Sequence, residues 1–297
     1  MKNFTLFLAA LLVTVFSCNK IDTSQEVFEI LLPVEVTNWD PEYVKTVVQK
    51  IYVEEYTGHT CLYCPAGAAI LKTIMDEDPT VIVTAIHCTS LANPMNNEYF
   101  NKDYKTPMGD ILCDDFDIAG LPKATINRRL INQGWGIDRN QWKKEIENID
   151  RDNVRAGIEL ICNVDETKHE IEAKVSVTII KEIPNPVQLC LVLQQDSIIS
   201  GQIDGSNYIL DYEHNHMLRA GFKGNYGIKL TSTGKVDEQL KYSTTFKLNY
   251  GNSFPYSFVP VNINQCSVVA YLLDMETKEV IQVETYSMNH YKIMNFN

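Results

Sequence analysis

A Cys-x-x-Cys motif, formed by Cys61 and Cys64, constrains this chain more than any other feature of its sequence. Before the motif, a run of β-branched and aromatic residues over 50–56 predicts a strand. After it, apolar residues recur at a helical period over 65–75 and predict a helix. Pro65 fits the first turn of that helix, because a proline there loses no hydrogen bond. We therefore expect Cys61 to face the helix N-terminus, with Cys64 one turn in, which favours the Cys61 thiolate.

Three kinds of chemistry use such a pair: a redox-active dithiol, a static disulfide and half of a zinc site. Zinc is disfavoured because the chain has no second Cys-x-x-Cys motif. No phosphate loop, nucleophile elbow or paired-carboxylate arrangement is evident, so we expect no cofactor and no metal. The redox and static alternatives both remain open. In the redox interpretation, Cys61 attacks a partner disulfide and Cys64 resolves the mixed disulfide.

The elements predicted over 48–152 follow the order β-α-β-α-β-β-α. This is the order of the thioredoxin fold, whose first strand-to-helix junction carries the redox motif. Besides the two elements that flank the motif, we expect strands at 80–86, 123–128 and 130–133, a short helix at 109–116, and a helix that Asp138 caps together with Gln141.

Three further residues gain a role from this topology. Pro122 precedes a predicted strand, where thioredoxin-like proteins carry a cis-proline that packs against the redox pair. Leu121 would then present its backbone to an extended partner chain. Glu55 lies six residues before Cys61, where thioredoxins often have a buried acid that accepts protons; a solvent-facing strand residue is the alternative.

After residue 152 the pattern changes to strands alone. Alternating apolar and polar residues over 171–179 predict a half-buried strand, and we expect further strands at 187–193, 245–250, 268–273 and 279–285. Several short strands separated by turns predict a β-sandwich, here of the immunoglobulin-like type. The predicted fold is thus multidomain, with a thioredoxin-like α/β domain over 48–152 and an all-β sandwich over 153–297.

The N-terminus predicts export. Residues 1–17 combine Lys2 with a short apolar run, as in a signal peptide. The sequence Val-Phe-Ser-Cys that ends at Cys18 resembles a bacterial lipobox, so we expect a lipid on Cys18 and a spacer over 18–47. An ordinary secretory signal is the alternative. The net charge of −12 argues against nucleic acid as a partner.

Export also makes disulfides possible for the other cysteines. Cys88 and Cys113 flank the segment 89–115 and could form a second disulfide, whereas Cys162, Cys190 and Cys266 fall in predicted strands and are typical of small buried residues. The segment 89–115 could be a substrate clamp or a lid. Surface or core positions are favoured for His214 and His216 over a metal site, and His59 could tune Cys61.

Several sequence blocks resemble the outer-membrane-protein-28 family of Gram-negative surface lipoproteins: residues 54–65 around the Cys-x-x-Cys motif, and residues 85–87, 116–128 and 212–219. The resemblance covers most of the chain. It implies an outer-membrane or cell-surface lipoprotein, anchored through Cys18, with a thioredoxin-like domain followed by a β-sandwich. It leaves open whether the protein exchanges disulfides with envelope proteins or binds a surface ligand around a static disulfide.

The lipobox predicts that Cys18→Ala removes the lipid anchor. The variant should move from the membrane fraction to the soluble fraction and should lose metabolic labelling by a fatty-acid analogue. A wild-type protein that takes up no label would contradict the lipobox interpretation.

Overall fold

The computed structural model describes residues 47–247 and 261–288. The predicted signal peptide, Cys18 and nearly all of the spacer lie outside these residues. No helix within the described ranges is both long and apolar enough to cross a membrane. The elements are β1 (Ile51–Thr57), α1 (Cys64–Glu77), β2 (Val81–His87), η2 (Ser90–Ala92), α2 (Pro107–Asp115), β3 (Lys123–Ile126), β4 (Ile137–Asp138), α3 (Trp142–Glu147), β5 (Ala156–Asp165), β6 (Glu170–Ile179), β7 (Val187–Gln195), β8 (Ile198–Asp204), β9 (Asn207–His214), β10 (Met217–Phe222), β11 (Ile228–Thr231), β12 (Gln239–Lys247), η3 (Ile263–Gln265), β13 (Cys266–Asp274) and β14 (Val280–Ser287).

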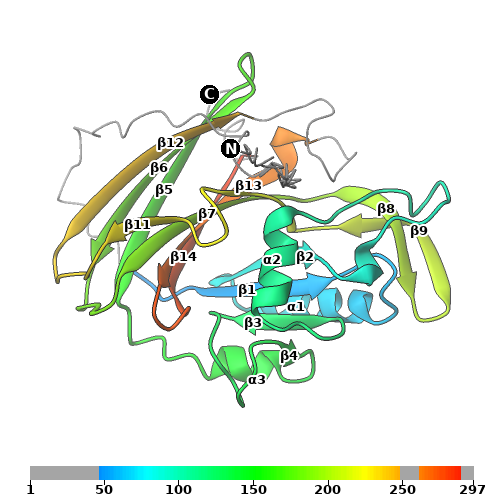
Figure 1. Cartoon of the computed structure of the whole chain (residues 1–297), viewed down its shortest axis with the longest axis horizontal. Coiled ribbons are helices and arrows are strands. Elements are labelled where there is room, and N and C mark those ends of the chain that lie inside the picture. The colour runs from blue at the N-terminus through cyan, green and yellow to red at the C-terminus, as the bar shows by residue number, and fades with distance from the viewer. Residues whose placement is uncertain (1–46, 248–260, 289–297) are drawn as a thin grey trace, which may run out of the picture.

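One large sheet runs through both halves of the chain (Figure 1). Its strand order is β14-β13-β7-β10-β2-β1-β3-β4, and β11 pairs with β7. In the α/β half, β1 pairs in parallel with β2 and antiparallel with β3. The junction between the halves is short: Met217 of β10 pairs with Ala85 of β2, and the Ala85 amide donates to the His216 carbonyl over 2.7 Å. The β-rich half therefore extends the sheet of the α/β half.

Two smaller sheets complete the structure. Strands β12, β6 and β5 form an antiparallel layer that faces β7 and β13 across an apolar core. Strands β8 and β9 form a separate hairpin, which projects beside α1 and β2 at the opposite end of the molecule (Figure 1).

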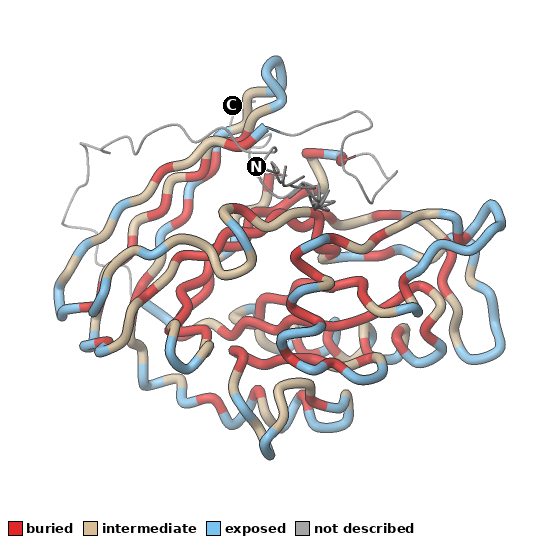
Figure 2. Tube along the Cα trace, in the orientation of Figure 1, coloured by how far each residue is buried: buried red, intermediate tan, exposed pale blue. Residues whose placement is uncertain are grey.

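The central strands are buried along much of their length, drawn red in Figure 2, and their buried residues form three main clusters. Helices α1 and α3 pack on one face of β1–β3, and the β12-β6-β5 layer packs on β7 and β13. A third cluster joins Tyr52 and Ile86 of the α/β half to Val192 and Tyr271 of the β-rich half, under α2. Alternate residues of β7 and β13 enter different clusters, so both strands are buried on both faces, as their continuous apolar runs require.

The predicted order, a mixed α/β region followed by a β-rich region, is confirmed at this level. Strands or helices occupy most of the predicted positions, including 50–56, 65–75, 80–86, 109–116 and 171–179. The strand predicted at 130–133 is wrong: Ile131 and Gly134 form only an isolated bridge, and the second strand of this pair lies at Ile137–Asp138. Positive φ angles at Asn132 and Gln133 turn the chain there.

The predicted capping box at Asp138 is also wrong. Helix α3 begins at Trp142, with Gln141 as its N-cap and no side-chain cap. The carbonyl of Asp138 instead accepts the Gln141 amide at 2.9 Å, which closes a turn before the helix. Strand β12 begins six residues before the predicted 245–250, of which 248–250 lie outside the described residues.

A buried ion pair of the α/β half lies where the two halves meet. Arg128 and Glu54 have side-chain exposures of 0% and 1%, and the guanidinium donates to both carboxylate oxygens, at 2.6 and 2.8 Å. The same guanidinium donates to the Tyr271 hydroxyl at 2.9 Å and lies over the rings of Phe116 and Tyr271. Residues from β1, the end of β3, α2 and β13 therefore meet at one charge.

We predict that Arg128→Met lowers the free energy of unfolding by about 3–5 kcal/mol, because it leaves the Glu54 carboxylate buried without a partner. Arg129→Met is the matched control, since this neighbour is 41% exposed and its loss should cost at most about 1 kcal/mol. Denaturant unfolding measures both. Adding Glu54→Gln should recover much of the loss; a loss below about 1 kcal/mol in Arg128→Met would contradict this account.

Candidate redox site

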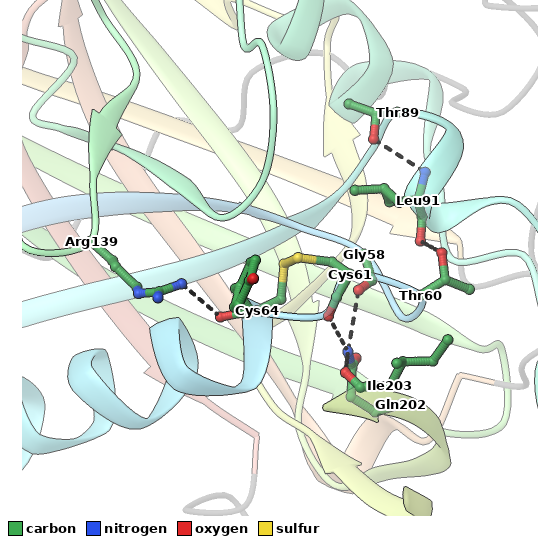
Figure 3. The surroundings of a disulfide bond; sticks show 10 residues. Gly58, Thr60, Cys61, Cys64, Thr89, Leu91, Arg139, Gln202 and Ile203 are labelled. Carbon is green, nitrogen blue, oxygen red and sulfur yellow. Dashed lines mark hydrogen bonds between the residues drawn. A yellow bond between two sulfur atoms is a disulfide. The ribbon is translucent and has the colours of Figure 1, made fainter. Parts of the chain in front are cut away.

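Cys61 and Cys64 form a disulfide at the N-terminal end of α1 (Figure 3). The helix begins at Cys64 itself, with Tyr63 at the N-cap, so Cys64 is the first helical residue and not one turn in. Cys61 precedes the helix by three residues. Both sulfur-bearing residues are only 2% exposed, whereas Leu62 and Tyr63 between them are 46% and 58% exposed.

The β8–β9 hairpin closes over the Cys61 loop. The Gln202 side chain donates to the carbonyls of Cys61 at 3.2 Å and Gly58 at 3.4 Å (Figure 3). The amide of Ile203 donates to the His59 carbonyl, and that of Gly205 to the Leu62 carbonyl, each at 2.9 Å. A segment some 140 residues further along the chain thus packs over the loop that carries Cys61, and we call this hairpin the cover.

The segment after β2 closes the loop from another side. Thr60 donates from both its amide and its hydroxyl to the Leu91 carbonyl, at 3.0 and 2.8 Å. A Cβ at Gly58 would lie 2.5 Å from the same oxygen, so only glycine allows this approach. On the α3 side, Arg139 donates to the Tyr63 carbonyl at 3.3 Å and lies over the Tyr63 ring.

Glu55 lies under the first turns of α1. It is 4% exposed, its Oε1 has no hydrogen-bond partner, and burial raises its pKa to about 8. A Cβ at Gly67 would lie 3.1 Å from both this oxygen and the Cγ of Pro122. Gly67 follows Cys64 by three residues and shares its helix face. The carboxyl, the proline ring and Cys64 therefore gather around one face of α1, and the solvent-facing alternative for Glu55 is wrong.

The Leu121–Pro122 peptide bond is cis, as the sequence predicts. Pro122 is buried and stands directly before β3, whose first residue, Lys123, pairs with Tyr56 of β1. Leu121 is half-buried and packs against the cluster that the two halves share. The functional roles assigned to these two residues stay predictions.

Three histidines gather where the hairpin meets the Cys61 loop and the end of β2. His59, His87 and His214 are 0%, 3% and 5% exposed, and each ring lies 5.3–5.5 Å from the ring of Tyr104. Burial lowers the pKa of His59, lowers that of His214 to about 4, and holds that of His87 well below its usual value. His216 lies apart from this cluster and faces Asp196 at 3.1 Å.

The remaining cysteines of the described residues are free and buried. Cys88 and Cys113 share a thiol hydrogen bond, and the disulfide considered for them is not formed. Burial raises the pKa of Cys162, Cys190 and Cys266 to about 12, in line with their predicted role as small core residues.

The sequence does not predict that the β8–β9 hairpin packs over the Cys61 loop, or that His87 lies beside Tyr104 and His214. Large side chains alternate along β9 from Tyr208 to His214, but five of the eight residues of this strand are exposed and only His214 is buried. His87 ends an otherwise apolar strand and gives no local signal. Both features depend on contacts between segments more than 100 residues apart in the sequence.

Two solved structures illustrate what the chain is similar to. HBP35 of Porphyromonas gingivalis matches with a TM-score of 0.63 at 18% identity, over 82% of this chain and 76% of that one. A domain of the outer membrane lipoprotein Omp28 from Porphyromonas gingivalis matches with a TM-score of 0.32 at 18% identity, over 47% of this chain and 92% of that one. No curated protein matches the chain.

The family comparison is more specific than these structural likenesses. The family model described as outer membrane protein Omp28 matches residues 110–292, which run from α2 through β14. This match spans more than half of the chain and includes the β8–β9 hairpin that packs over the Cys61 loop. The chain therefore belongs to the Omp28 family of outer membrane proteins.

Proposed function

We propose that this outer-membrane protein exchanges disulfides with thiol- or disulfide-bearing proteins of the cell envelope through Cys61 and Cys64. One observation carries the proposal: the disulfide, the uncompensated Glu55 carboxyl and cis-Pro122 all meet the same face of α1. A static disulfide never exchanges protons and does not require a buried carboxyl with a pKa of about 8. A thiol pair that gains and loses protons can use such a carboxyl as proton donor and acceptor.

The topology supports a thioredoxin-like assignment for the α/β half. Strands β1 and β2 are parallel around α1, β3 and β4 follow antiparallel, and the cis-proline stands directly before β3. For the β-rich half, the β12-β6-β5 layer facing β7 and β13 supports an immunoglobulin-like sandwich. In this proposal a lipid on Cys18 tethers both halves to the membrane.

The exchange begins when a partner thiolate attacks the Cys61 sulfur. A bond forms between those two sulfurs, the Cys61–Cys64 bond breaks, and its electron pair leaves on Cys64. A second partner thiolate then attacks the partner sulfur and releases Cys61 as a thiolate. The partner loses two electrons and becomes a disulfide, while the Cys61–Cys64 pair gains them; the reverse sequence oxidises the pair.

Glu55 is suited to the proton that this step requires. With a pKa of about 8, its carboxyl is mostly protonated at neutral pH and can give a proton to the leaving Cys64 sulfur. In the reverse direction the carboxylate takes the proton back. Pro122 would hold the backbone of Leu121 beside the disulfide, where an extended partner segment pairs with it.

The second candidate function is surface binding around a static disulfide. The observation that favours it is the cover: Cys61 is 2% exposed, and the β8–β9 hairpin is held over its loop by backbone and side-chain hydrogen bonds. A partner sulfur cannot reach Cys61 in this closed arrangement, so exchange requires the hairpin to move.

Trapping distinguishes the two functions. Cys64→Ala keeps the attacking sulfur and removes the resolving one, so it should accumulate mixed disulfides with envelope proteins on non-reducing gels. Cys61→Ala is the matched control, because its remaining thiol on Cys64 is buried at the helix start and should trap at least tenfold less. Equal trapping by both variants, or none by either, would favour the binding function.

Glu55→Gln should separate activity from stability. The folded-state pKa of Glu55 is raised from 4.5 to about 8, so the acid's contribution to stability is full below pH 4.5 and is lost as pH rises towards 8. The amide cannot ionise, so the advantage in stability of the variant over wild type should grow as pH rises from 5 to 8, by on the order of 3–5 kcal/mol in total. Denaturant unfolding measures this gain. Exchange at neutral pH should slow by about 10- to 100-fold; unchanged exchange would remove Glu55 from the mechanism.

A further inference from the structure

Four aromatic side chains from separate parts of the chain meet where the β8–β9 hairpin docks beside the Cys61 loop. His59 belongs to the Cys61 loop, His87 ends β2, Tyr104 precedes α2, and His214 ends β9. Tyr104 contacts all three imidazoles, and the rings of His87 and His214 lie 5.5 Å apart. We call the three imidazoles the histidine cluster.

The imidazole nitrogens of this cluster are largely without partners. Neither nitrogen of His87 has a hydrogen bond, and Nδ1 of His59 and Nε2 of His214 also have none. His59 uses its Nε2 on the Asn93 carbonyl at 3.1 Å, and His214 bonds the Gly201 backbone. Buried polar groups are almost always paired, so four unpaired nitrogens in one place are an exception that calls for an explanation.

A metal ion is not the explanation that the described residues favour. Nowhere within them do three histidine, cysteine or carboxylate side chains converge in a way that could hold one. No nearby negative charge within the described ranges stabilises a protonated imidazole in the cluster either. The electrostatic influences on His87 come from His214 and His59, and those on His214 from His59, without a carboxylate among them.

The charged groups nearby act on the surrounding tyrosines. Glu55 of β1 and Asp204 of β8 act on Tyr212, whose ring lies 4.8 Å from that of His214, and Arg219 of β10 acts on Tyr104. His216 faces Asp196 outside the cluster. Protonating the cluster therefore places like charges next to one another in a buried site that contains no compensating anion.

We propose that the histidine cluster is a proton-sensitive latch, whose protonation releases the β8–β9 hairpin and exposes the Cys61–Cys64 disulfide. His214 belongs to the hairpin, whereas His59 and His87 belong to the part that the hairpin covers, so repulsion between them acts directly on the docked interface. Gln202, Ile203 and Gly205 of the same hairpin and its turn hold the Cys61 loop, so the loop is uncovered when the hairpin leaves. The biological use of the latch rests on the proposed exchange function, but its opening does not.

The direction of the pH effect follows from the lowered pKa values in the closed state. The closed state binds fewer protons than the open one, so it is fully stable above pH 6.5 and loses stability as pH falls towards 4. His214, with a pKa of about 4 when closed and 6.5 when exposed, favours opening about tenfold at pH 5.5. Burial also holds the pKa of His87 well below its usual value, so protonation of His87 favours opening in the same direction.

The test is reduction of the disulfide in the full chain by a water-soluble phosphine, which needs no protein partner. The phosphine takes one oxygen from water and becomes its oxide, while the two sulfurs take the two hydrogens. The rate is divided at each pH by the rate for the same protein unfolded in denaturant, which removes the pH dependence of the reagent. This ratio should rise about 10- to 100-fold from pH 7.5 to pH 5.5.

The double variant His87→Phe/His214→Phe keeps two aromatic rings and removes two titrating groups, so its ratio should rise less than threefold over the same range. His169→Gln, in the exposed β5–β6 turn, is the control and should behave as wild type. Hydrogen exchange, corrected for intrinsic rates, should show wild-type residues 198–214 losing protection at pH 5.5 while 266–274 keep it.

The latch would be overturned if the rate ratio of the wild type did not change with pH, or if the double variant showed an equal rise. It would also be overturned if residues 198–214 and 266–274 lost protection together. A rise that disappears when a chelator is added would overturn it too, because a metal would then be responsible. A latch that passes this test while Cys64→Ala traps no partner would stand, and the exchange function would fail alone.

Discussion

The buried ion pair between Arg128 and Glu54 fixes the strands around the disulfide site. It fixes β1 against the end of β3 and, through the Tyr271 hydroxyl, against β13 of the β-rich half. Breaking one partner leaves a charge without water or counter-ion, so alternative arrangements of these strands are strongly disfavoured. Because β1 leads directly into the Cys61 loop, the ion pair also fixes where the disulfide stands relative to the β8–β9 hairpin.

The neighbouring residues Glu54 and Glu55 of β1 lie in different surroundings: Glu54 forms an ion pair, and Glu55 lies beside α1 near the disulfide. Neighbouring strand residues point to opposite faces, so Glu54 meets Arg128 while Glu55 meets α1 and Pro122. Both are buried, but only Glu54 has a cation as partner. Burial without compensation raises the pKa of Glu55 to about 8, which suits proton transfer at neutral pH. The same absence of compensation in the histidine cluster makes the cover sensitive to protons.

Local patterns were sufficient to predict the elements that flank the disulfide, although not the strand and the helix cap after residue 129. The strand before Cys61, the helix after it and the cis-proline follow from composition, periodicity and topology within about 70 residues. The turn at 130–133 was missed because its left-handed residues are asparagine and glutamine, whose turn signal is weaker than that of glycine.

The sheet that unites both halves could not be predicted in this way. Met217 and Ala85 pair across 132 positions, and no periodicity records which strand edges meet. The same holds for Gln202, whose amide reaches the Cys61 carbonyl from a hairpin with weak alternation. Sequence reasoning therefore found Cys61, Cys64 and Glu55, but not the hairpin that packs over the Cys61 loop.

The reduction potential of the Cys61–Cys64 pair tests the central claim most directly. Equilibration of the purified mature protein with a graded series of glutathione buffers, read out by mass after alkylation, gives the value. Exchange with envelope proteins predicts a potential between about −270 and −120 mV, the range of thiol–disulfide exchange proteins. A potential below about −300 mV would mark a structural disulfide and contradict the account.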